Sequence, residues 1–347
     1  MIDNIYMLEN IAIICFIEIL LIILLYKLSF KINLLDHPNK IKSHIDPIPL
    51  IGGIAIYLGI LCSIFLFDYN LLILKLIYTS SLIILLGLVD DYINLNSLIR
   101  LLLQICISTI IYLFGFKVIN IGIIPGVGYF SIYDINSYIF TIVSLITLIN
   151  AFNFQDGIDG LATTNIITSL ILFCLMSYFF SIDVLSLNII LIIIVLSLVF
   201  LLFNFSKKYK IFLGSSGSYF YGFFYGSLII YISQNNSFFT NNYFIIWFIF
   251  LPVMDMLSLF ILRISNKRNP MLGDRNHIHH LLQKQNYTQL NINLIINFLS
   301  LSIILLGLVI EFYYPQVSII LFSLMSLAYI FLKNVYANNY SLYDEYK

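Results

Sequence analysis

Pairs of acidic residues stand at the ends of long apolar stretches in this chain. Asp90 and Asp91 follow the run ILLGLV, and Asp156 and Asp159 lie in NAFNFQDGIDGLA. A carboxylate at the end of a membrane helix is costly unless it binds a cation, carries a proton or pairs with a basic group. Adjacent carboxylates also repel each other, which a divalent cation relieves. A helix cap needs only one Asp, so the doubled residues favour Mg²⁺ binding or proton abstraction.

The segment that leads to Asp156 offers further polar groups at helical spacing. Asn150 and Asn153 are three residues apart, so they share one face of a helix. Two Asp-Gly pairs then form a turn before the next apolar stretch, whereas a plain turn uses Asp-Gly once. Carboxylate oxygens suit Mg²⁺, and they can also accept a hydrogen bond from a base N–H or a sugar hydroxyl.

A glycine-rich segment, FLGSSGSYFYG at 212–222, opens a later apolar stretch. Gly214 and the backbone N–H groups that lead into a helix can hold a phosphate. Phe212 can stack on a base. A Gly/Ser turn before a helix explains the segment equally well.

Basic and imidazole groups gather in two polar loops, DHPNKIKSHIDPIPLIGG from residue 36 and DRNHIHHL from residue 274. The candidate phosphate-binding side chains there are Lys42, His44, Arg275, His277, His279 and His280. Zinc is conceivable, but the loop has no HExxH pattern and no Cys partner. Imidazoles beside an Arg fit an anionic diphosphate better. Lys42 alone would also fit a plain flanking charge, and Asp255 could pair structurally with a neighbouring helix.

The composition indicates a membrane protein that must position these groups on helices. Of 347 residues, 61% are hydrophobic and 10% are charged, and the mean hydropathy is +1.00. The formal net charge is zero, so no nucleic-acid partner is expected. We predict one all-α transmembrane domain over residues 1–347 with about 10–11 helices. The predicted spans are 8–28, 48–67, 71–89, 99–116, 137–151, 163–181, 187–205, 216–233, 243–262, 291–312 and 316–333. A small hairpin is expected within 117–136.

The positive charges orient the chain. Of the 17 Lys and Arg residues, only Lys75 and Lys117 fall on one side of the predicted spans. Because Lys and Arg concentrate in cytoplasmic loops, the N-terminus is expected outside and the C-terminus in the cytoplasm. The motif-bearing loops, at 29–47, 90–98, 152–162, 206–216 and 263–290, then share the cytoplasmic face.

Together these motifs resemble the polyprenyl-phosphate N-acetylhexosamine-1-phosphate transferases, which belong to glycosyl transferase family 4. DDYINL, NAFNFQDGIDGLA and DRNHIHHL carry the resemblance, which runs from about residue 36 to 282. The form DRNHIHH looks more like the branch that transfers N-acetylglucosamine-1-phosphate. The resemblance implies a bacterial cytoplasmic-membrane enzyme that moves a sugar-1-phosphate from a UDP-sugar to undecaprenyl phosphate. UMP would leave, and cell-envelope glycan synthesis would begin. Such enzymes are often dimers.

The resemblance also implies roles for the candidate residues. Asp90, Asp91 and His277 would be catalytic, and the two Asp residues would activate or position the lipid phosphate. Asp159 would face the uracil, and Phe212 would stack on it. The remaining substrate-binding residues would be Lys42, His44, Asn150, Asn153, Gly214, Arg275, His279 and His280. Asp91, Asp156 and Ser215 would be the positions of the Mg²⁺ ligands, with Mn²⁺ as a substitute.

The chain departs from the family pattern at two positions. The family usually has Asp where Ser215 stands, and a Ser hydroxyl is a neutral, weak ligand for a hard cation. An Arg that often precedes Lys42 is replaced by Ile41. A catalytically impaired homologue that binds a substrate or a partner enzyme is therefore the alternative function. A different UDP-sugar is the alternative within the enzyme class. A transporter would predict inverted repeats, which the sequence does not clearly contain.

Overall fold

The computed structural model describes residues 2–38, 46–181, 185–235, 238–239, 241–267 and 276–345, with side chains described between residues 6 and 336. The main helices are α1 (Ile2–Ile32), α2 (Gly52–Ser63), α3 (Leu71–Ile93), α4 (Ser97–Leu113), α5 (Asp134–Gln155), α6 (Leu161–Phe180), α7 (Leu187–Asn204), α8 (Gly214–Asn235), η1 (Asn242–Ile249), α9 (Phe250–Ser265), α10 (Ile278–Lys284), α11 (Gln289–Tyr313) and α12 (Pro315–Glu345). The strands are β1 (Leu35–Asp36), β2 (Ile48–Pro49), β3 (Asn120–Ile124) and β4 (Gly128–Ser131).

The prediction of an all-α polytopic membrane fold is confirmed. Within the described ranges, eight helical stretches are long and apolar enough to cross a membrane. α2 and α4 are apolar but shorter, and η1 continues directly into α9 to form one of the eight. The predicted span 48–67 was too long, because residues 48–49 pair as β2 with β1 and only 52–63 form α2. The predicted span 137–151 was too short, because α5 starts at Asp134 and ends at Gln155.

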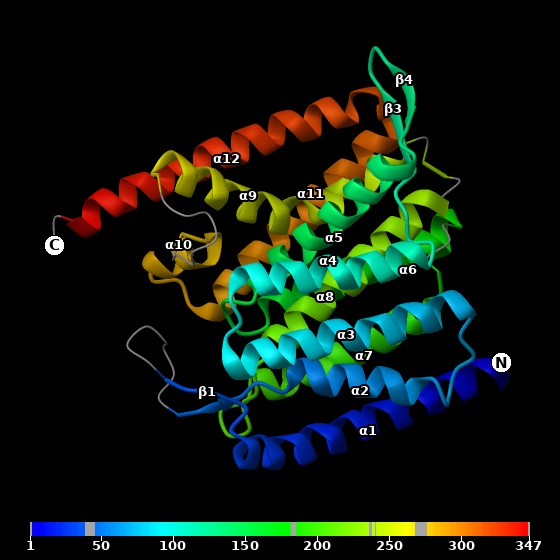
Figure 1. Cartoon of the computed structure of the whole chain (residues 1–347), viewed down its shortest axis with the longest axis vertical. Helices are drawn as coiled ribbons and strands as arrows, with labels where there is room; N and C mark the ends of the chain where they lie inside the picture. Colours follow the sequence, from blue (N-terminus) through cyan, green and yellow to red (C-terminus); the bar gives the residue numbers. More distant parts are fainter. Residues whose placement is uncertain are drawn as a thin grey trace.

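The hairpin expected within 117–136 is present as antiparallel β3 and β4. In Figure 1 it projects at the same end of the molecule as the N-terminus, whereas β1 and α10 lie at the opposite end. The acidic motifs lie at the ends of α3 and α5 and the described histidines lie at the start of α10, all toward that opposite end, so the fold gathers them on one side.

Helix α8 occupies the centre of the molecule and is buried along nearly its whole length. Its neighbours α2, α3 and α5 approach it at glycines. A Cβ added at Gly53 would lie 2.1 Å from the backbone N of Gly217, and one at Gly87 would lie 2.3 Å from Ser216 Cα. Small residues allow helix backbones to approach closely in membranes. The two glycines therefore fix the first turn of α8 against α2 and α3.

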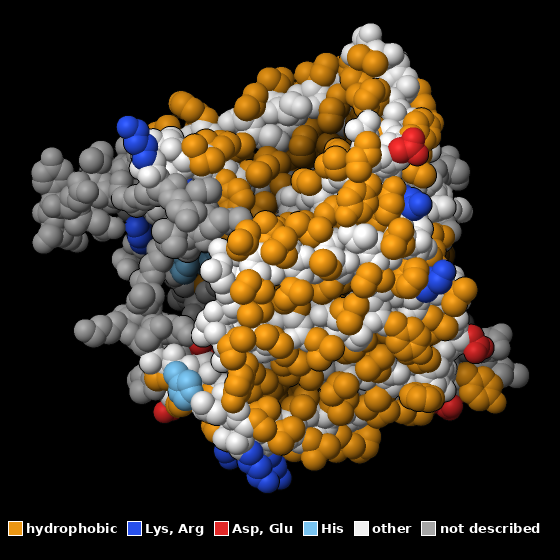
Figure 2. All heavy atoms as spheres, viewed as in Figure 1, with side chains coloured by type: hydrophobic (Ala, Val, Ile, Leu, Met, Phe, Trp, Pro, Cys, Tyr) orange, Lys and Arg blue, Asp and Glu red, His pale blue; other side chains and the backbone are white. Residues whose placement is uncertain are grey.

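The outer surface is apolar, as a lipid-facing surface requires. Figure 2 shows hydrophobic side chains over the face formed by α2, α3 and α4, with the charged side chains toward the edges. α12 is mostly exposed between Pro315 and Tyr336 and lies along α9 at the edge of the molecule. These surfaces are consistent with a multi-pass membrane protein.

Candidate active site

A cleft of about 1280 Å³ lies at the end of the molecule that carries the motifs. It is bounded by the ends of α3 and α5, the turn after α5, the segment before α8, β1 and α10. Of the residues predicted from the sequence, the cleft is lined by Asp90, Asp91, Asn153, Asp156, Asp159, Phe212, Gly214, Ser215 and His280. The fold thus brings together residues that are up to 190 positions apart in the chain.

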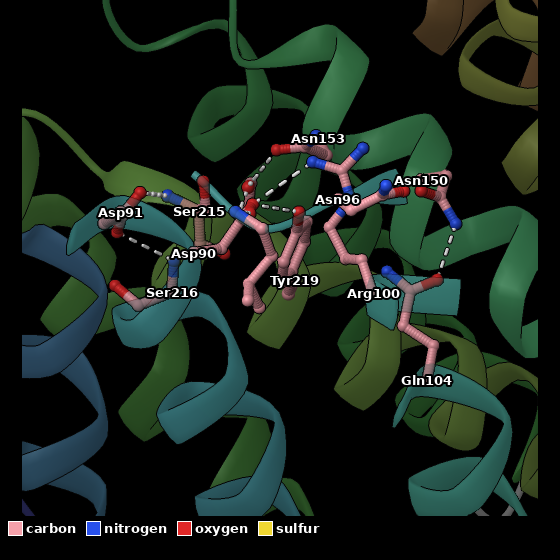
Figure 3. Close-up of polar contacts among 12 residues, drawn as sticks. Asp90, Asp91, Asn96, Arg100, Gln104, Asn150, Asn153, Ser215, Ser216 and Tyr219 are labelled. Carbon is pink, nitrogen blue, oxygen red and sulfur yellow. Dashed lines mark hydrogen bonds and ion pairs between the residues drawn. The ribbon is translucent and has the colours of Figure 1, made fainter. Parts of the chain in front are cut away.

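Asp91 lies against the N-terminus of α8 (Figure 3). One carboxylate oxygen accepts the backbone N–H of Ser215 at 2.8 Å, and the other accepts that of Ser216 at 3.3 Å. The unpaired N–H groups of a helix N-terminus stabilise a negative charge. Gly214 has φ +75°, and a Cβ there would lie 2.7 Å from the Asp91 carboxylate. The two N–H groups expected to cradle a phosphate therefore hold the Asp91 side chain instead.

Asp90 is buried and fully engaged with protein groups. One of its oxygens accepts the backbone N–H of Leu95 at 3.0 Å. The other accepts Arg100 Nη1 at 3.2 Å and the Tyr219 hydroxyl at 2.7 Å (Figure 3). Arg100 also lines the cleft. Asp90 is therefore placed to hold the Arg100 guanidinium at the cleft wall.

The turn after α5 places two further carboxylates at the cleft. Burial raises the pKa of Asp156 well above its usual range, and the nearby charges of Asp91 and Asp159 raise it further. Asp159 forms an ion pair with Lys210, whose Nζ lies 2.6 Å from a carboxylate oxygen. The same ammonium lies 5.4 Å from the centre of the Phe212 ring. Asp159, Lys210 and Phe212 therefore form one local cluster.

The two asparagines of α5 separate in the structure. Asn153 lines the cleft, and its side-chain oxygen accepts the Ser218 hydroxyl at 3.0 Å. Asn150 lies outside the cleft lining and donates to Gln104 of α4 at 2.8 Å (Figure 3). Asn150 thus joins α5 to α4, and the structure does not bring it to the cleft with Asn153.

The histidines also separate. His280 lines the cleft, whereas His277 and His279 are buried behind it. Burial, together with His280 and His277, lowers the pKa of His279 well below its usual value. A neutral imidazole cannot offset phosphate charge. The His279 ring instead contacts Gly157, where a Cβ would lie 2.1 Å from His279 Nε2.

His277 is held by Asp255, which lies in α9. His277 Nδ1 is 2.8 Å from one Asp255 oxygen, and the other oxygen accepts the backbone N–H of Ile278 at 3.1 Å. Lys333 of α12 forms an ion pair with Asp255 and donates to its backbone carbonyl at 3.0 Å. The structural pairing considered for Asp255 is confirmed, and the pairing ties α9, α10 and α12 together.

Three predicted residues, Lys42, His44 and Arg275, lie outside the described residues. The cleft also contains polar residues that the sequence analysis did not select as site residues, namely Asp36, His37, Asn94, Arg100, Asn204, Lys210, Gln283 and Gln289. Lys210 could have been found from its position two residues before Phe212, since alternate residues of an extended segment point the same way. Arg100, on the helix after Asp91, is interpreted from the sequence either as a phosphate ligand or as a charge at the membrane interface, and the structure places it at the cleft.

The acidic residues of the cleft bear on Mg²⁺ binding. Within the described ranges, no group of three His, Cys, Asp or Glu side chains is arranged to hold a metal ion unaided. Mg²⁺ commonly takes one or two carboxylates and completes its shell with water and substrate phosphates. Asp91 and Asp156 supply two carboxylates on one cleft. Burial is the main cause of the raised pKa of Asp156, and the negative charges of Asp91 and Asp159 add a repulsion that a cation would relieve. The carboxylates of Asp91 and Asp156 therefore fit a Mg²⁺ ion whose remaining ligands are water and substrate phosphates.

Most of the chain is similar in sequence to known proteins. Residues 73–233 match glycosyl transferase family 4. The chain is similar to the undecaprenyl-phosphate alpha-N-acetylglucosaminyl 1-phosphate transferase of Escherichia coli O157:H7, with 27% identity over 323 residues, which cover 87% of this chain and 84% of that protein. It is 29% identical to the proteins of the same name from Salmonella typhi, covering 77% of this chain and 74% of that protein, and Haemophilus influenzae, covering 85% and 84%. The resemblance expected from the motifs is therefore confirmed: the chain matches glycosyl transferase family 4 over residues 73–233 and is similar over most of its length to bacterial undecaprenyl-phosphate alpha-N-acetylglucosaminyl 1-phosphate transferases.

Proposed function

We propose that the chain transfers N-acetylglucosamine-1-phosphate from UDP-N-acetylglucosamine to undecaprenyl phosphate and releases UMP. The proposal is carried by one observation: the cleft joins Asp91, at the N-terminus of α8, to Asp156 and Asp159 after α5. In this reaction an oxygen of the lipid phosphate bonds to the phosphorus that bears the sugar. The bond from that phosphorus to the UMP oxygen breaks, and UMP carries away the electron pair.

The substrates are both anionic, so their approach must be helped by positive charge. Arg100 and Lys210 supply two cations at the cleft wall, and His280 supplies an imidazole. Asp90 holds the Arg100 guanidinium, which makes Asp90 a positioning residue for that charge. Asp91 and Asp156 would hold Mg²⁺, which when bound neutralises charge on the diphosphate.

Phe212 and Asp159 form the proposed base subsite, and the Lys210 ammonium is near both of them. Asn153 is placed to contact the diphosphate or the sugar, because it lies beside Asp156 on the cleft wall.

The active site would face the cytoplasm, with the N-terminus outside. Labelling of single cysteines introduced at Asn94 and Val127 with a membrane-impermeant reagent tests this orientation.

Transfer can be measured with purified protein, radiolabelled UDP-N-acetylglucosamine and undecaprenyl phosphate at millimolar Mg²⁺. A labelled lipid product that disappears in the Asp91→Asn variant would support the proposal. A panel of UDP-sugars distinguishes N-acetylglucosamine from other N-acetylhexosamines. No lipid product with any of these donors would sink the enzyme proposal.

Ser215 favours a second candidate function, a substrate-binding homologue with little catalysis. Ser215 lies in the first turn of α8, and its backbone N–H donates to the Asp91 carboxylate. The family pattern has one more carboxylate at this position. This second function predicts that UDP-N-acetylglucosamine binds to the purified protein without transfer.

A further inference from the structure

Hairpin β3–β4 is fixed to the bundle by side chains of α8 and of the segment that begins η1. Gln234, near the end of α8, accepts the Asn120 N–H at 2.8 Å and donates to the Asn120 carbonyl at 2.9 Å. Further along β3, the Asn241 side chain accepts the Ile123 N–H at 3.0 Å, and the Tyr243 hydroxyl donates to the Ile123 carbonyl at 3.0 Å. These contacts fix the position of the hairpin, so the surface that it presents is a defined one.

The surface of the hairpin is apolar and uncharged. The sequence has no charged residue between Lys117 and Asp134. Ile123 and Tyr129 lie directly opposite each other in the ladder, so their side chains share one face of the hairpin, and they are 39% and 60% exposed. Tyr133, where the hairpin leads into α5, is 62% exposed. Apolar side chains held in contact with water are unfavourable, so this face is expected to have a partner.

The direction of the hairpin indicates what that partner is. Helices α1 and α3 are long and apolar enough to cross a membrane, and the hairpin projects across their direction rather than along it (Figure 1). The hairpin therefore extends sideways, over the bilayer that surrounds the helices. Exposed tyrosines also mark this end of α1, α6 and α11, namely Tyr6, Tyr178, Tyr313 and Tyr314. Because Tyr is enriched where a membrane meets water, the hairpin lies at the level of that boundary.

The backbone of the hairpin limits how deep it can lie. A sheet of two strands leaves N–H and C=O groups unpaired along its outer edges, and the hydrocarbon core of a bilayer cannot satisfy them. The headgroup region supplies water to these groups and still accepts apolar and aromatic side chains. The headgroup region is therefore the environment that suits both the backbone and the side chains.

We propose that hairpin β3–β4 is a membrane-anchoring element whose Ile123–Tyr129 face lies in the phospholipid headgroup region beside the bundle. This lipid contact lies at the end of the molecule opposite the cleft, and it requires no assumption about the transfer reaction. Because Gln234 belongs to α8, the contact also fixes this end of the central helix relative to the bilayer.

Tryptophan emission can measure the depth of the hairpin. Trp247 is the one tryptophan of the chain and is 1% exposed, so the wild type gives a constant background. The variants Tyr129→Trp and Tyr133→Trp each replace one exposed aromatic side chain by another, so folding should be retained. The full-length proteins are reconstituted into phosphatidylcholine vesicles whose lipids carry bromine at either a shallow or a deep position of the acyl chain. Phe298→Trp is the matched control, since Phe298 is 73% exposed within the membrane-crossing helix α11.

Bromine quenches tryptophan only at close range, so the order of quenching reports the depth. The shallow lipid should quench the emission from positions 129 and 133 about twofold more than the deep lipid does, as expected for side chains at the membrane boundary. The control at position 298 should show the reverse order. Because both leaflets contain the brominated lipid, the result does not depend on the orientation of the protein in the vesicle.

Three results would overturn the proposal, and iodide on both sides of the membrane helps to distinguish them. Quenching by iodide without quenching by either brominated lipid would place the hairpin in water. Emission that neither iodide nor either lipid quenches would mean that protein covers the face, such as a second copy of this chain. Equal or stronger quenching by the deep lipid would place the hairpin in the hydrocarbon core.

Discussion

Ser215→Asp places a carboxylate at the position where the resemblance leads us to expect one, and its effect can be worked from the geometry around Asp91. The Asp91 oxygens already accept the N–H groups of Ser215 and Ser216. A new carboxylate on residue 215 would lie about 5 Å from that of Asp91. Two like charges at about 5 Å repel by roughly 3 kcal/mol at an effective dielectric constant near 20. The N-terminus of α8 offsets up to about 1 kcal/mol of this cost.

The balance predicts a Ser215→Asp protein that is about 2 kcal/mol less stable than the wild type without a divalent cation. Mg²⁺ should reverse the difference, because the added carboxylate binds the cation that neutralises both charges. Thermal unfolding in detergent over a Mg²⁺ titration measures this, and Ser215→Asn is the matched neutral control. The Mg²⁺ concentration for half-maximal transfer should fall about tenfold or more in Ser215→Asp only.

One result would refute this reasoning. If Ser215→Asp and Ser215→Asn respond to Mg²⁺ as the wild type does, in both unfolding and transfer, then residue 215 does not face the cation. The metal would then have to be sought away from the first turn of α8.

Three further predictions concern charges described above. Arg100→Met leaves the buried Asp90 carboxylate without its cation, so the free energy of unfolding should fall by about 2 kcal/mol, measured as a lower melting temperature. Lys333→Met should likewise destabilise by about 3 kcal/mol, because Asp255 is buried beneath α12, and the double variant with Asp255→Asn should recover part of the loss. The raised pKa of Asp156 means that Mg²⁺ must displace a proton below that pKa, so Mg²⁺ affinity should rise with pH by up to about tenfold per pH unit. Calorimetric titration of Mg²⁺ at a series of pH values above the ordinary Asp pKa of about 4 would show this rise, and an affinity that stays flat over the whole series would contradict it.

The sequence predicted the helices well because apolar length is a direct signal of a membrane span. It failed where local structure competes with apolarity, as at residues 48–49, which pair as β2 although the flanking residues are apolar. Helix α8 was expected from the stretch 216–233, but nothing in that stretch revealed that it lies at the centre. Its burial depends on the glycines at 53 and 87, which lie in other helices.

The site was predictable as a set of motifs but not as a set of contacts. Asn150 and Asn153 share a helix face by their i,i+3 spacing, yet only Asn153 lines the cleft, whereas Asn150 donates a hydrogen bond to Gln104 of α4. The link between Asp91 and Ser215 spans 124 residues. A local sequence pattern cannot reveal a contact between two residues so far apart in the chain. For the same reason the pairing of Asp159 with Lys210 was missed, although both residues were visible in the sequence.

The central place of α8 has a consequence for how the protein is made. Gly, Ser and Tyr make up more than half of this helix, and it is not among the eight described stretches apolar enough to cross a membrane on their own. A helix of this composition gains little from lipid and depends on protein neighbours. Glycosylation mapping should therefore find that α8 inserts poorly as an isolated segment and efficiently after α2, α3 and α5. Helix α8, whose N-terminus holds Asp91, would therefore insert into the membrane only after the helices that pack against it have inserted. The active site would then be completed late in biogenesis, when most of the bundle is already in place.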